Sequence, residues 1–469
     1  MYINILGYGI TNKALVTLLN KHNIICHIYD DRYENDEIDS IGNSYQSFKK
    51  VATLRTNNPN GDANLAIISP GIAPDSAFLS YFKNIMSEYD FIFHIKKGIY
   101  SIWISGTNGK TTTTEMLSCM LHAKSGGNIG TPLATLFMQD FNDTQIDVTQ
   151  CDRMQNQVYD VVSKQDSNAV WVLETSSFTL HYTHYALPNI YILLPLSQDH
   201  ISWHGGFESY IADKLKPLKY INDAKDPKKH YALIPQELMQ YEVAKDIINN
   251  TKANVMLYTD SNMLYSYLQC EKKYFECFKE PFRLDFLVAA SGMLFGNIDF
   301  TINYILEYKI GAYRMEEHVK HGLLFINDSK ATNPHAVFSA LHTYTQYRIY
   351  LILGGDSKGA EMDMLYPFLQ ENGVKVFSIG KDGGKIASEC KAKNIWVKEC
   401  LSLDKAMESI YSKLREDYLL DSIKDIETCC NDTNKPIVML SPACASLDQY
   451  SSYKERGDRF NMLIEKVFG

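Results

Sequence analysis

The stretch from Tyr100 to Thr114 constrains this chain most, because it combines an apolar strand, a tight glycine turn and the start of a helix. Backbone N–H groups in such a loop, and at the N-terminus of the helix that follows it, point at anionic oxygens. A lysine in the loop reaches the terminal phosphates, and the next threonine can ligate Mg²⁺. The sequence therefore predicts a nucleoside triphosphate site, with Lys110 as an exposed loop side chain and Thr111 beside it.

The loop departs from the strict phosphate-loop pattern, which requires glycine where this chain has Ile104. The simpler alternative is a Ser/Thr/Asn/Gly turn that only caps a helix. An apolar strand precedes the turn, and Met116, Leu117, Met120 and Leu121 follow it at helical spacing. This context favours phosphate binding over simple capping.

Composition excludes several classes of protein. A chain of 469 residues is expected to form two to four domains, and its net charge of −9 argues against bulk electrostatic binding of nucleic acid. No apolar run is as long as a membrane span, and the N-terminal segment resembles a strand, so we expect a cytoplasmic protein without membrane insertion. The ten cysteines include no Cys-x-x-Cys pair, which favours reduced thiols over a zinc site or a disulfide framework.

The first section has the pattern of a Rossmann-type unit. Tyr2–Leu6 is strand-like and precedes Gly7-x-Gly9, and Leu65–Ile68 is a further apolar strand that ends in a loop. Asn12 replaces the third fingerprint glycine, so an NAD site is less well supported than a mononucleotide site or a structural turn.

In the central section, the apolar strand Ala169–Leu173 places Glu174 at its carboxyl end, one strand from the phosphate loop. A Mg²⁺ ligand is expected at such a position, although an isolated Glu after a strand is usually a surface residue or a helix cap. Residues 138–168 are polar and show little periodicity, which indicates a surface insertion, partly disordered or forming a short acidic helix.

Two further polar side chains follow the next strand, Ile190–Leu196. His200 lies just after it, and Lys214 falls in a predicted helix over Phe207–Tyr220. Taken alone, the histidine would be read as structural and the lysine as a solvated charge.

The third section alternates strands with helical stretches, which indicates a second doubly wound sheet with polar loops at one edge. Its strands are expected at Leu323–Ile326, Arg348–Leu353, Val374–Ile379 and Ile437–Leu440. We therefore predict an α/β fold with three domains: a Rossmann-like domain over 1–97, a central P-loop ATPase-type domain over 98–309 and a Rossmann-like domain over 310–469.

Together these segments resemble the Mur ligase family of peptidoglycan synthesis. The resemblance covers all three predicted domains and leaves mainly 138–168 and 223–280 unmatched. The matching segments are the phosphate loop, 127–130, 174–178, 199–200, 327–333, 354–358 and 441–449. The phosphate loop and Asp199-His200 are general to the family, whereas 327–333 and 441–449 are much more specific.

The resemblance implies an ATP-dependent amide ligase that adds D-glutamate to UDP-N-acetylmuramoyl-L-alanine through an acyl phosphate. It implies small-molecule partners, ATP and two Mg²⁺ ions, and we expect a monomer that closes its C-terminal domain over the bound substrates.

The resemblance also assigns residues. Lys110, Glu174, His200, Lys214 and Lys358 match catalytic positions, and Thr111, Glu174, His200 and Lys214, the last as a CO₂-derived carbamate, match metal ligands. ATP contacts are implied for Gly106, Thr107, Asn108, Gly109, Lys110, Thr111, Thr112, Arg314, Asp328 and Lys330. The uridine-diphosphate substrate is matched by Ile10, Thr11, Asp31, Arg32, Gly71, Asn128 and Ser176. The incoming D-glutamate is matched by Thr332, Lys358, Ser446, Leu447 and Tyr453.

The chain departs from the family pattern in three places. The His-Asn-x-x-Asn segment whose last Asn meets adenine is Pro281–Asp285 here, which leaves Asp285 as the substitute. Tyr313 stands where the family has a His, and Tyr453 where it has a Phe.

Three alternatives remain. The nearest is another amide ligase of the superfamily, adding L-alanine, a diamino acid, a dipeptide or folate-linked glutamate, and the segment 441–449 argues against it. The interpretation as an NAD-dependent oxidoreductase rests on Gly7-x-Gly9 alone. A regulator that only binds nucleotide would keep Lys110 but would not need Glu174, His200 and Lys214 in order.

Overall fold

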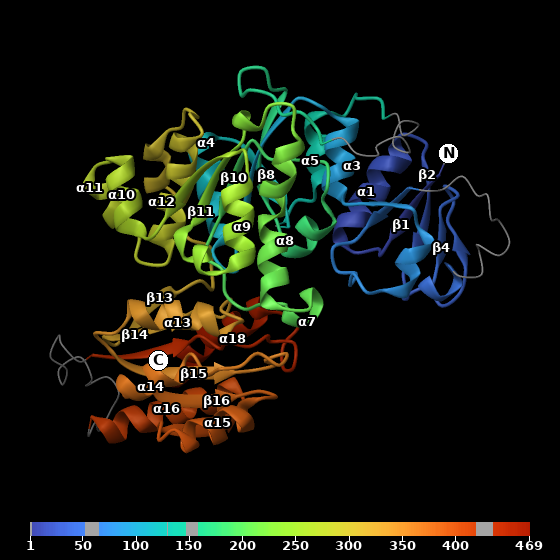
Figure 1. Cartoon of the computed structure of the whole chain (residues 1–469). Helices are drawn as coiled ribbons and strands as arrows, with labels where there is room; N and C mark the ends of the chain where they lie inside the picture. The colour runs from blue at the N-terminus through green and yellow to red at the C-terminus, as the bar shows by residue number, and fades with distance from the viewer. Residues whose placement is uncertain (1, 52–64, 129, 147–157, 419–434) are drawn as a thin grey trace. The chain divides into compact units, whose positions relative to one another are not determined.

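The computed structural model describes residues 2–51, 65–128, 130–146, 158–418 and 435–469. The chain divides into two compact units, one formed by residues 1–278 and 282–308 and the other by residues 279–281 and 309–469. The described residues form three sheets of six strands each, two in the first unit and one in the second (Figure 1). Among the described residues, no helix combines the length and the apolar character needed to cross a membrane.

The first sheet has the strand order β3-β4-β2-β1-β5-β6 and is parallel except for the β3–β4 pair. Its strands are β1 (Tyr2–Leu6), β2 (Ile25–Tyr29), β3 (Glu37–Ile38), β4 (Ser44–Gln46), β5 (Leu65–Ile68) and β6 (Asn84–Met86), and its helices are α1 (Ile10–Lys21) and α3 (Glu88–Ile95). Asn12 is fully buried and donates to the carbonyls of Leu6 and Gly7. The residue that replaces the third fingerprint glycine therefore closes the first turn.

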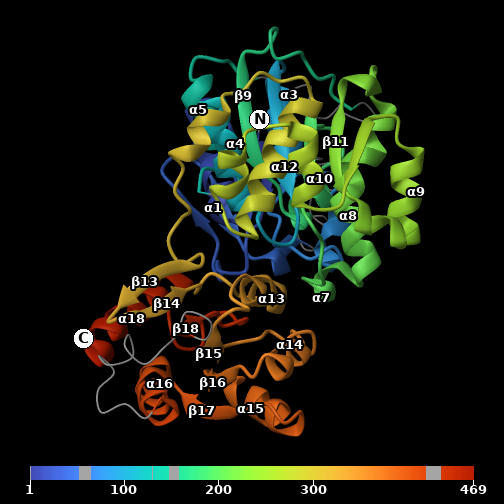
Figure 2. The same cartoon turned by 90° about the vertical axis from the view of Figure 1, so that its left-hand side faces the viewer.

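The second sheet is all parallel, with the order β12-β11-β10-β7-β9-β8. Its strands are β7 (Ile99–Ser105), β8 (Lys124–Gly127), β9 (Ala169–Glu174), β10 (Ile190–Leu193), β11 (Tyr231–Pro235) and β12 (Asn254–Tyr258). Its helices are α4 (Lys110–Leu121), α5 (Leu133–Asp140), α6 (Ser177–Tyr182), α7 (Ile201–His204), α8 (Phe207–Tyr220), α9 (Glu242–Asn250), α10 (Ser261–Leu268), α11 (Lys272–Glu276) and α12 (Phe282–Phe295). Helices α4 and α12 lie side by side (Figure 2), and α8 packs against α6 and α9.

The first two sheets share one apolar core. Buried side chains of the first sheet, such as Ile5 and Ile28, belong to the same cluster as Trp103 and Leu173 of the second sheet. This continuity explains why both sheets lie in one compact unit. The boundary predicted at 97/98 falls between α3 and β7 and stays a prediction.

The third sheet forms the core of the second unit, with the order β13-β14-β18-β15-β16-β17 and one antiparallel pair, β13–β14. Its strands are β13 (Glu316–Lys320), β14 (Leu323–Asn327), β15 (Arg348–Gly354), β16 (Lys375–Ile379), β17 (Val397–Leu401) and β18 (Pro436–Leu440). Its helices are α13 (Pro334–Thr343), α14 (Tyr366–Glu371), α15 (Gly383–Ala392), α16 (Leu403–Asp417) and α18 (Tyr453–Phe468).

The described residues of the segment 138–168 are mostly exposed or half-buried, but a few apolar side chains anchor it to the core. It begins inside α5, Phe141 is buried, and Met138, Ile146 and Tyr159 pack against the core of the first unit. These apolar side chains are too widely spaced to give a helical or strand-like period, which is why the sequence did not predict their burial. Residues 147–157, where a short helix or disorder was expected, lie outside the described residues.

Candidate active site

The phosphate loop connects β7 to α4, as predicted. Gly106 has φ +147° and Gly109 has φ +79°, backbone conformations that favour glycine. A Cβ atom on Gly106 would lie 2.5 Å from the Leu194 Cβ, and one on Gly109 would overlap the carboxylate of Asp285. Both glycines are therefore required by conformation and by space.

Lys110 is not the exposed loop side chain that was expected. It is the first residue of α4, is half-buried, and donates to the carbonyls of Gly106 at 3.0 Å and Thr107 at 2.7 Å. Burial lowers the pKa of Lys110, opposed by the negative charges of Glu174 and Asp199. The ammonium group is thus held at the loop with backbone oxygens as its partners.

Glu174 ends β9 with a carboxylate that faces the phosphate loop. Its side chain is buried, Thr111 donates its hydroxyl to Oε2 at 2.9 Å, and the Asn128 amide donates to Oε1 at 2.9 Å. The Tyr89 hydroxyl fixes the backbone by donating to the Glu174 carbonyl at 3.0 Å. The structure therefore brings together predicted residues from the ends of three strands.

Lys214 reaches the same loop from α8. Only 1% of the residue is exposed, and its amine donates to Ser105 Oγ and to the Gly106 carbonyl, each at 2.9 Å. Burial, together with the positive charge of Lys110, lowers the pKa of Lys214 well below its usual range. The solvated lysine that sequence alone would suggest is thus a buried amine beside the phosphate loop.

His200 lies at the start of α7 in a left-handed backbone conformation, with φ +52°. Its Nε2 atom is 3.5 Å from Asp199 Oδ2. Burial lowers the pKa of His200, and the charges of Lys110 and Lys214 add to this effect. The negative charge of Asp199 opposes this shift.

The donor set suits a hard divalent cation. Carboxylate and hydroxyl oxygens from Glu174 and Thr111 are the ligand types that Mg²⁺ prefers. Within the residues that the structure describes, no three His, Cys, Asp or Glu side chains form a metal-binding cluster. A magnesium site here would therefore include ligands beyond these side-chain types, and the predicted threonine hydroxyl and lysine carbamate, together with Glu174 and His200, meet this condition.

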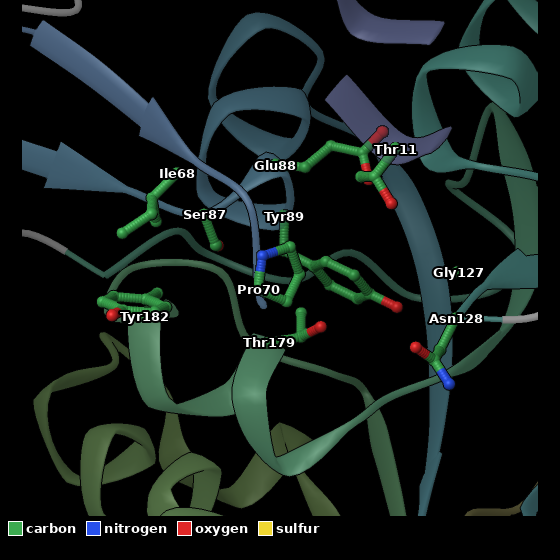
Figure 3. A pocket seen from close by; sticks show the side chains of 10 residues that line it. All are labelled: Thr11, Ile68, Pro70, Ser87, Glu88, Tyr89, Gly127, Asn128, Thr179 and Tyr182. Atoms are coloured by element: carbon green, nitrogen blue, oxygen red, sulfur yellow. The ribbon is translucent and has the colours of Figure 1, made fainter. Parts of the chain in front are cut away.

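A pocket in the first unit contains two of the residues predicted for the uridine-diphosphate substrate, Thr11 and Asn128. Figure 3 shows the ten residues that line it, which lie on or next to β5, β8, α1, α3 and α6. The other eight lining residues are Ile68, Pro70, Ser87, Glu88, Tyr89, Gly127, Thr179 and Tyr182. Because Asn128 also holds Glu174, this pocket adjoins the phosphate-loop site.

Glu88 is a buried carboxyl group in the wall of this pocket. Its Oε1 accepts a hydrogen bond from the Ala134 N–H at 2.9 Å, at the start of α5. Burial raises the pKa of Glu88 to about 8, although the backbone hydrogen bonds oppose the shift.

The remaining residues predicted for this substrate do not line the pocket. Arg32 is held by Asp30 at 2.7 Å, Asp31 accepts from Ser47, and Ser176 caps α6. Ile10 is 79% exposed at the start of α1, and Gly71 is exposed next to Pro70.

In the second unit, the loop 327–333 carries two residues predicted to contact ATP, Asp328 and Lys330. Asp328 is buried, accepts from the Ser441 hydroxyl at 2.7 Å and from the Met315 N–H, and burial raises its pKa to about 7. The Lys330 ammonium lies 5.8 Å from the centre of the Tyr453 ring. Arg314 is half-buried one residue before Met315.

The residues predicted for D-glutamate lie on neighbouring loops of this unit. Lys358 is exposed with φ +50°, in the loop after β15. This loop pairs with the segment 441–449, because Asp356 and Ala445 exchange backbone hydrogen bonds of 3.0 and 2.9 Å. Ser446 is buried on that segment, whereas Leu447 and Thr332 are exposed.

Arg456 joins two of these loops and was missed by the sequence reasoning. Its buried guanidinium donates to the hydroxyl and carbonyl of Ser329 and to the carbonyl of Cys444. No sequence signal distinguishes this arginine from a surface charge on α18. Ser105, Tyr89 and Tyr210, which hold Lys214, Glu174 and Thr107, were missed for the same reason.

Asp285, the substitute for the adenine-contacting Asn, is buried on α12 against Gly109 of the phosphate loop. The structure therefore places it beside the loop, within the first unit.

Comparisons with known proteins identify relatives of this chain. Residues 104–286 match the Mur ligase middle domain. The chain is 35% identical to the UDP-N-acetylmuramoylalanine–D-glutamate ligase of Campylobacter jejuni (strain RM1221), with 100% of each chain covered. It is 34% identical to the enzyme of the same name from Helicobacter pylori (strain HPAG1), over 99% of this chain and 100% of the relative.

Among solved structures, the MurF ligase from Thermotoga maritima in complex with ADP aligns over 89% of this chain and 91% of its own, with a TM-score of 0.49 and 16% identity. The resemblance inferred from the motifs is confirmed by the full-length sequence relatives. Because these relatives match the chain from end to end, it belongs to the Mur ligase family.

Proposed function

We propose that this protein is an ATP-dependent amide ligase that adds D-glutamate to UDP-N-acetylmuramoyl-L-alanine. The observation that carries the proposal is the end-to-end similarity to ligases named for this reaction. It is supported by a phosphate loop that shares hydrogen bonds with a buried carboxylate and a buried lysine. Because ATP drives the reaction, we assign it to the cytoplasm.

ATP would bind at the loop 106–112. The loop N–H groups and the N-terminus of α4 provide donors for the phosphates, and α4 adds the positive end of its dipole. Lys110 would exchange the carbonyls of Gly106 and Thr107 for phosphate oxygens, which are stronger acceptors. Asp285, beside Gly109, is the candidate for a contact with the base.

Thr111, Glu174, His200 and Lys214 as a carbamate would hold two Mg²⁺ ions. When bound, these ions would neutralise the charge of the phosphates and of the attacking carboxylate. The buried environment of Lys214 supports its modification, because a lowered pKa raises the fraction of unprotonated amine, which is the form that attacks CO₂. That step forms an N–C bond, breaks one C–O π bond of CO₂, releases one proton and converts the neutral amine into an anionic carbamate.

The reaction then has two steps. The L-alanyl carboxylate attacks the γ-phosphorus of ATP, which gives an acyl phosphate and ADP. The amine of D-glutamate attacks the acyl carbon, and the tetrahedral intermediate expels phosphate as the amine loses its proton. Lys110 would offset charge on the transferring phosphoryl group, and positioning supplies much of the remaining catalysis.

The two substrates would occupy different sites. The pocket that contains Thr11 and Asn128 is the candidate for the uridine-diphosphate substrate, with Arg32 available for its phosphates once released from Asp30. Lys358 and Ser446, on paired loops, are the candidates for the carboxylates of D-glutamate. We propose that residues 1–97, 98–309 and 310–469 act as the domains that bind these substrates and ATP.

The experiment that tests the function is phosphate release from ATP in the presence of UDP-N-acetylmuramoyl-L-alanine. D-Glutamate is compared with L-glutamate, L-alanine and a diamino acid. We expect release that requires both the nucleotide precursor and D-glutamate. Release with a different amino acid would replace the substrate assignment, and no release with any pair would contradict the ligase.

A further inference from the structure

A chain of hydrogen-bonded side chains lies next to the predicted metal ligands and has no role in the proposed reaction so far. His204 Nε2 is 2.9 Å from Ser177 Oγ, and His204 Nδ1 is 2.7 Å from Asp213 Oδ2. His181 Nδ1 lies 3.0 Å from both oxygens of the same carboxylate. We call Ser177, His204 and Asp213 the Ser–His–Asp chain.

The hydrogen bonds fix the orientation of the central imidazole. An ionised Asp213 accepts only, so the Nδ1 atom of His204 carries the proton. In the neutral imidazole, Nε2 then accepts the proton of the Ser177 hydroxyl. The His204 side chain is 0% exposed, and the Phe178 ring stacks on it at 5.6 Å with an interplanar angle of 11°. Both ring nitrogens are therefore engaged in a closed environment.

Each member of the Ser–His–Asp chain lies close in sequence to one predicted metal ligand. Ser177 follows Glu174 by three residues, His204 follows His200 by four, and Asp213 immediately precedes Lys214. The three members lie on three different helices, α6, α7 and α8. One imidazole thus joins the helix that follows Glu174, the helix that follows His200 and the helix that carries Lys214.

These elements need such a connection. Glu174 and Lys214 are separated by forty positions in sequence. Helix α7 has only four residues, so contacts of its side chains must fix its position. Trp203 packs on the Phe178 ring, and the hydrogen bonds of His204 add direction to this apolar contact. A metal site loses activity when its ligands shift by as little as about 1 Å, and groups behind the ligands set their orientation.

From this juxtaposition we propose that the Ser–His–Asp chain is the frame that positions Glu174, His200 and Lys214 for the metal–ATP complex. The inference rests on the proposed function and adds to it. Its members are positioning residues, which act on the reaction through the three ligands they hold.

The alternative is that the Ser–His–Asp chain is an ordinary buried hydrogen-bond network that only stabilises the fold. The protein contains a matched example, His27, whose Nδ1 lies 2.6 Å from Ser44 Oγ in the first sheet. If the Ser–His–Asp chain were only structural, breaking it would have the same kind of effect as breaking the His27–Ser44 pair.

The test uses His204→Asn, in which the shorter amide can still donate to Asp213 but cannot reach Ser177. Ser177→Ala removes the other partner, and His27→Asn is the matched control. Binding of Mn²⁺ in the presence of a non-hydrolysable ATP analogue is followed by electron paramagnetic resonance, which requires no turnover. The Mg²⁺ dependence of phosphate release, the KM for D-glutamate and thermal unfolding are measured on the same proteins.

We expect His204→Asn to weaken Mn²⁺ binding by at least about tenfold, the usual scale for groups behind metal ligands. The kcat should fall with it, while the KM for D-glutamate changes less, and His27→Asn should leave all three unchanged. In a double-mutant cycle, Ser177→Ala and His204→Asn should be non-additive, because both break the same hydrogen bond.

Mn²⁺ affinity in His204→Asn equal to that of the wild type would overturn the frame, as would losses that match those of His27→Asn. If His204→Asn does not fold, Ser177→Ala, which removes a single hydroxyl oxygen, decides by the same criterion. Because Mn²⁺ binding needs no turnover, a wild type that binds the ion but releases no phosphate would contradict the ligase and leave the frame testable.

Discussion

Burial gives the charged side chains of the first unit their chemical character. Lys214 and Lys110 both contact the Gly106 carbonyl, yet the first is 1% exposed and the second half-buried. The more buried amine is suited to carbamylation, and the more accessible one is suited to meeting the phosphates. Two lysines at one loop therefore have different predicted roles because their surroundings differ.

The role of Lys110 can be tested by Lys110→Ala. We expect at least about a thousandfold loss of phosphate release, because the substitution removes a charge aimed at the transferring phosphoryl group. The free energy of unfolding should fall by only about 1–2 kcal/mol, since two hydrogen bonds to carbonyls are lost. Lys124→Ala, at an exposed lysine paired with Asp140, is the control, and an active Lys110→Ala would contradict the ATP assignment.

Glu88 predicts a pH-dependent stability. Its pKa in the folded protein is about 8, above the ordinary value of 4.5, so between these pH values the folded state binds more protons than the unfolded state. Stability is therefore lost as the pH rises from 4.5 to 8, and the penalty is constant above pH 8. Its upper bound is about 5 kcal/mol.

Glu88→Gln should remove this penalty. Chemical denaturation of the wild type and the variant should give equal stabilities near pH 4.5 and a growing advantage for the variant up to pH 8. Glu242→Gln, at an exposed carboxylate on α9, is the control. A constant difference between wild type and Glu88→Gln at all pH values would contradict the prediction.

At the scale of elements, the loops at the carboxyl ends of the strands form the candidate site. The loops after β7, β8 and β9 meet through Glu174, as expected for parallel strands. In the second unit, the loops after β15 and β18 pair in the same way. In the second and third sheets, the predicted site residues therefore lie at the carboxyl ends of the strands.

The phosphate loop depends on Gly109, and Gly109→Ala tests this dependence. We expect ATP binding to be lost, because the added methyl group overlaps the Asp285 carboxylate and the residue has φ +79°. Gly373→Ala is the matched control, since Gly373 has φ +58° but open space around it, so only a backbone cost of about 1 kcal/mol is expected. Calorimetry measures the affinity of both variants for ATP. Normal affinity in Gly109→Ala would refute the steric argument.

Much of this architecture could be predicted from local pattern. Apolar runs predicted the strands that carry Glu174 and the phosphate loop, and the helix predicted over Phe207–Tyr220 is α8. The burial of Lys214 could not be predicted, because its partner Ser105 is 109 residues away. The Ser–His–Asp chain and Arg456 depend on tertiary contacts in the same way. Sequence pattern thus located the strand ends that carry the site, whereas tertiary packing determines which charged side chains are buried.

At the scale of the whole molecule, the proposed reaction distributes its components over both units. The phosphate loop and the pocket that contains Thr11 and Asn128 belong to the first unit, and Lys358 and Ser446 belong to the second. The amide bond forms only when the amine of D-glutamate reaches the acyl phosphate, which water also attacks. A ligase of this kind must therefore bring its units together with the substrates bound and exclude water from the intermediate.

We therefore expect the protein to compact when a non-hydrolysable ATP analogue and UDP-N-acetylmuramoyl-L-alanine are bound together. Small-angle X-ray scattering should show a smaller radius of gyration with both ligands than with either alone, because contacts to both ligands would favour the closed state. Gly109→Ala, which should not bind the ATP analogue, is the control and should not compact. An unchanged radius of gyration in the wild type with both ligands bound would contradict closure and would require the two units to be already arranged for reaction without ligand.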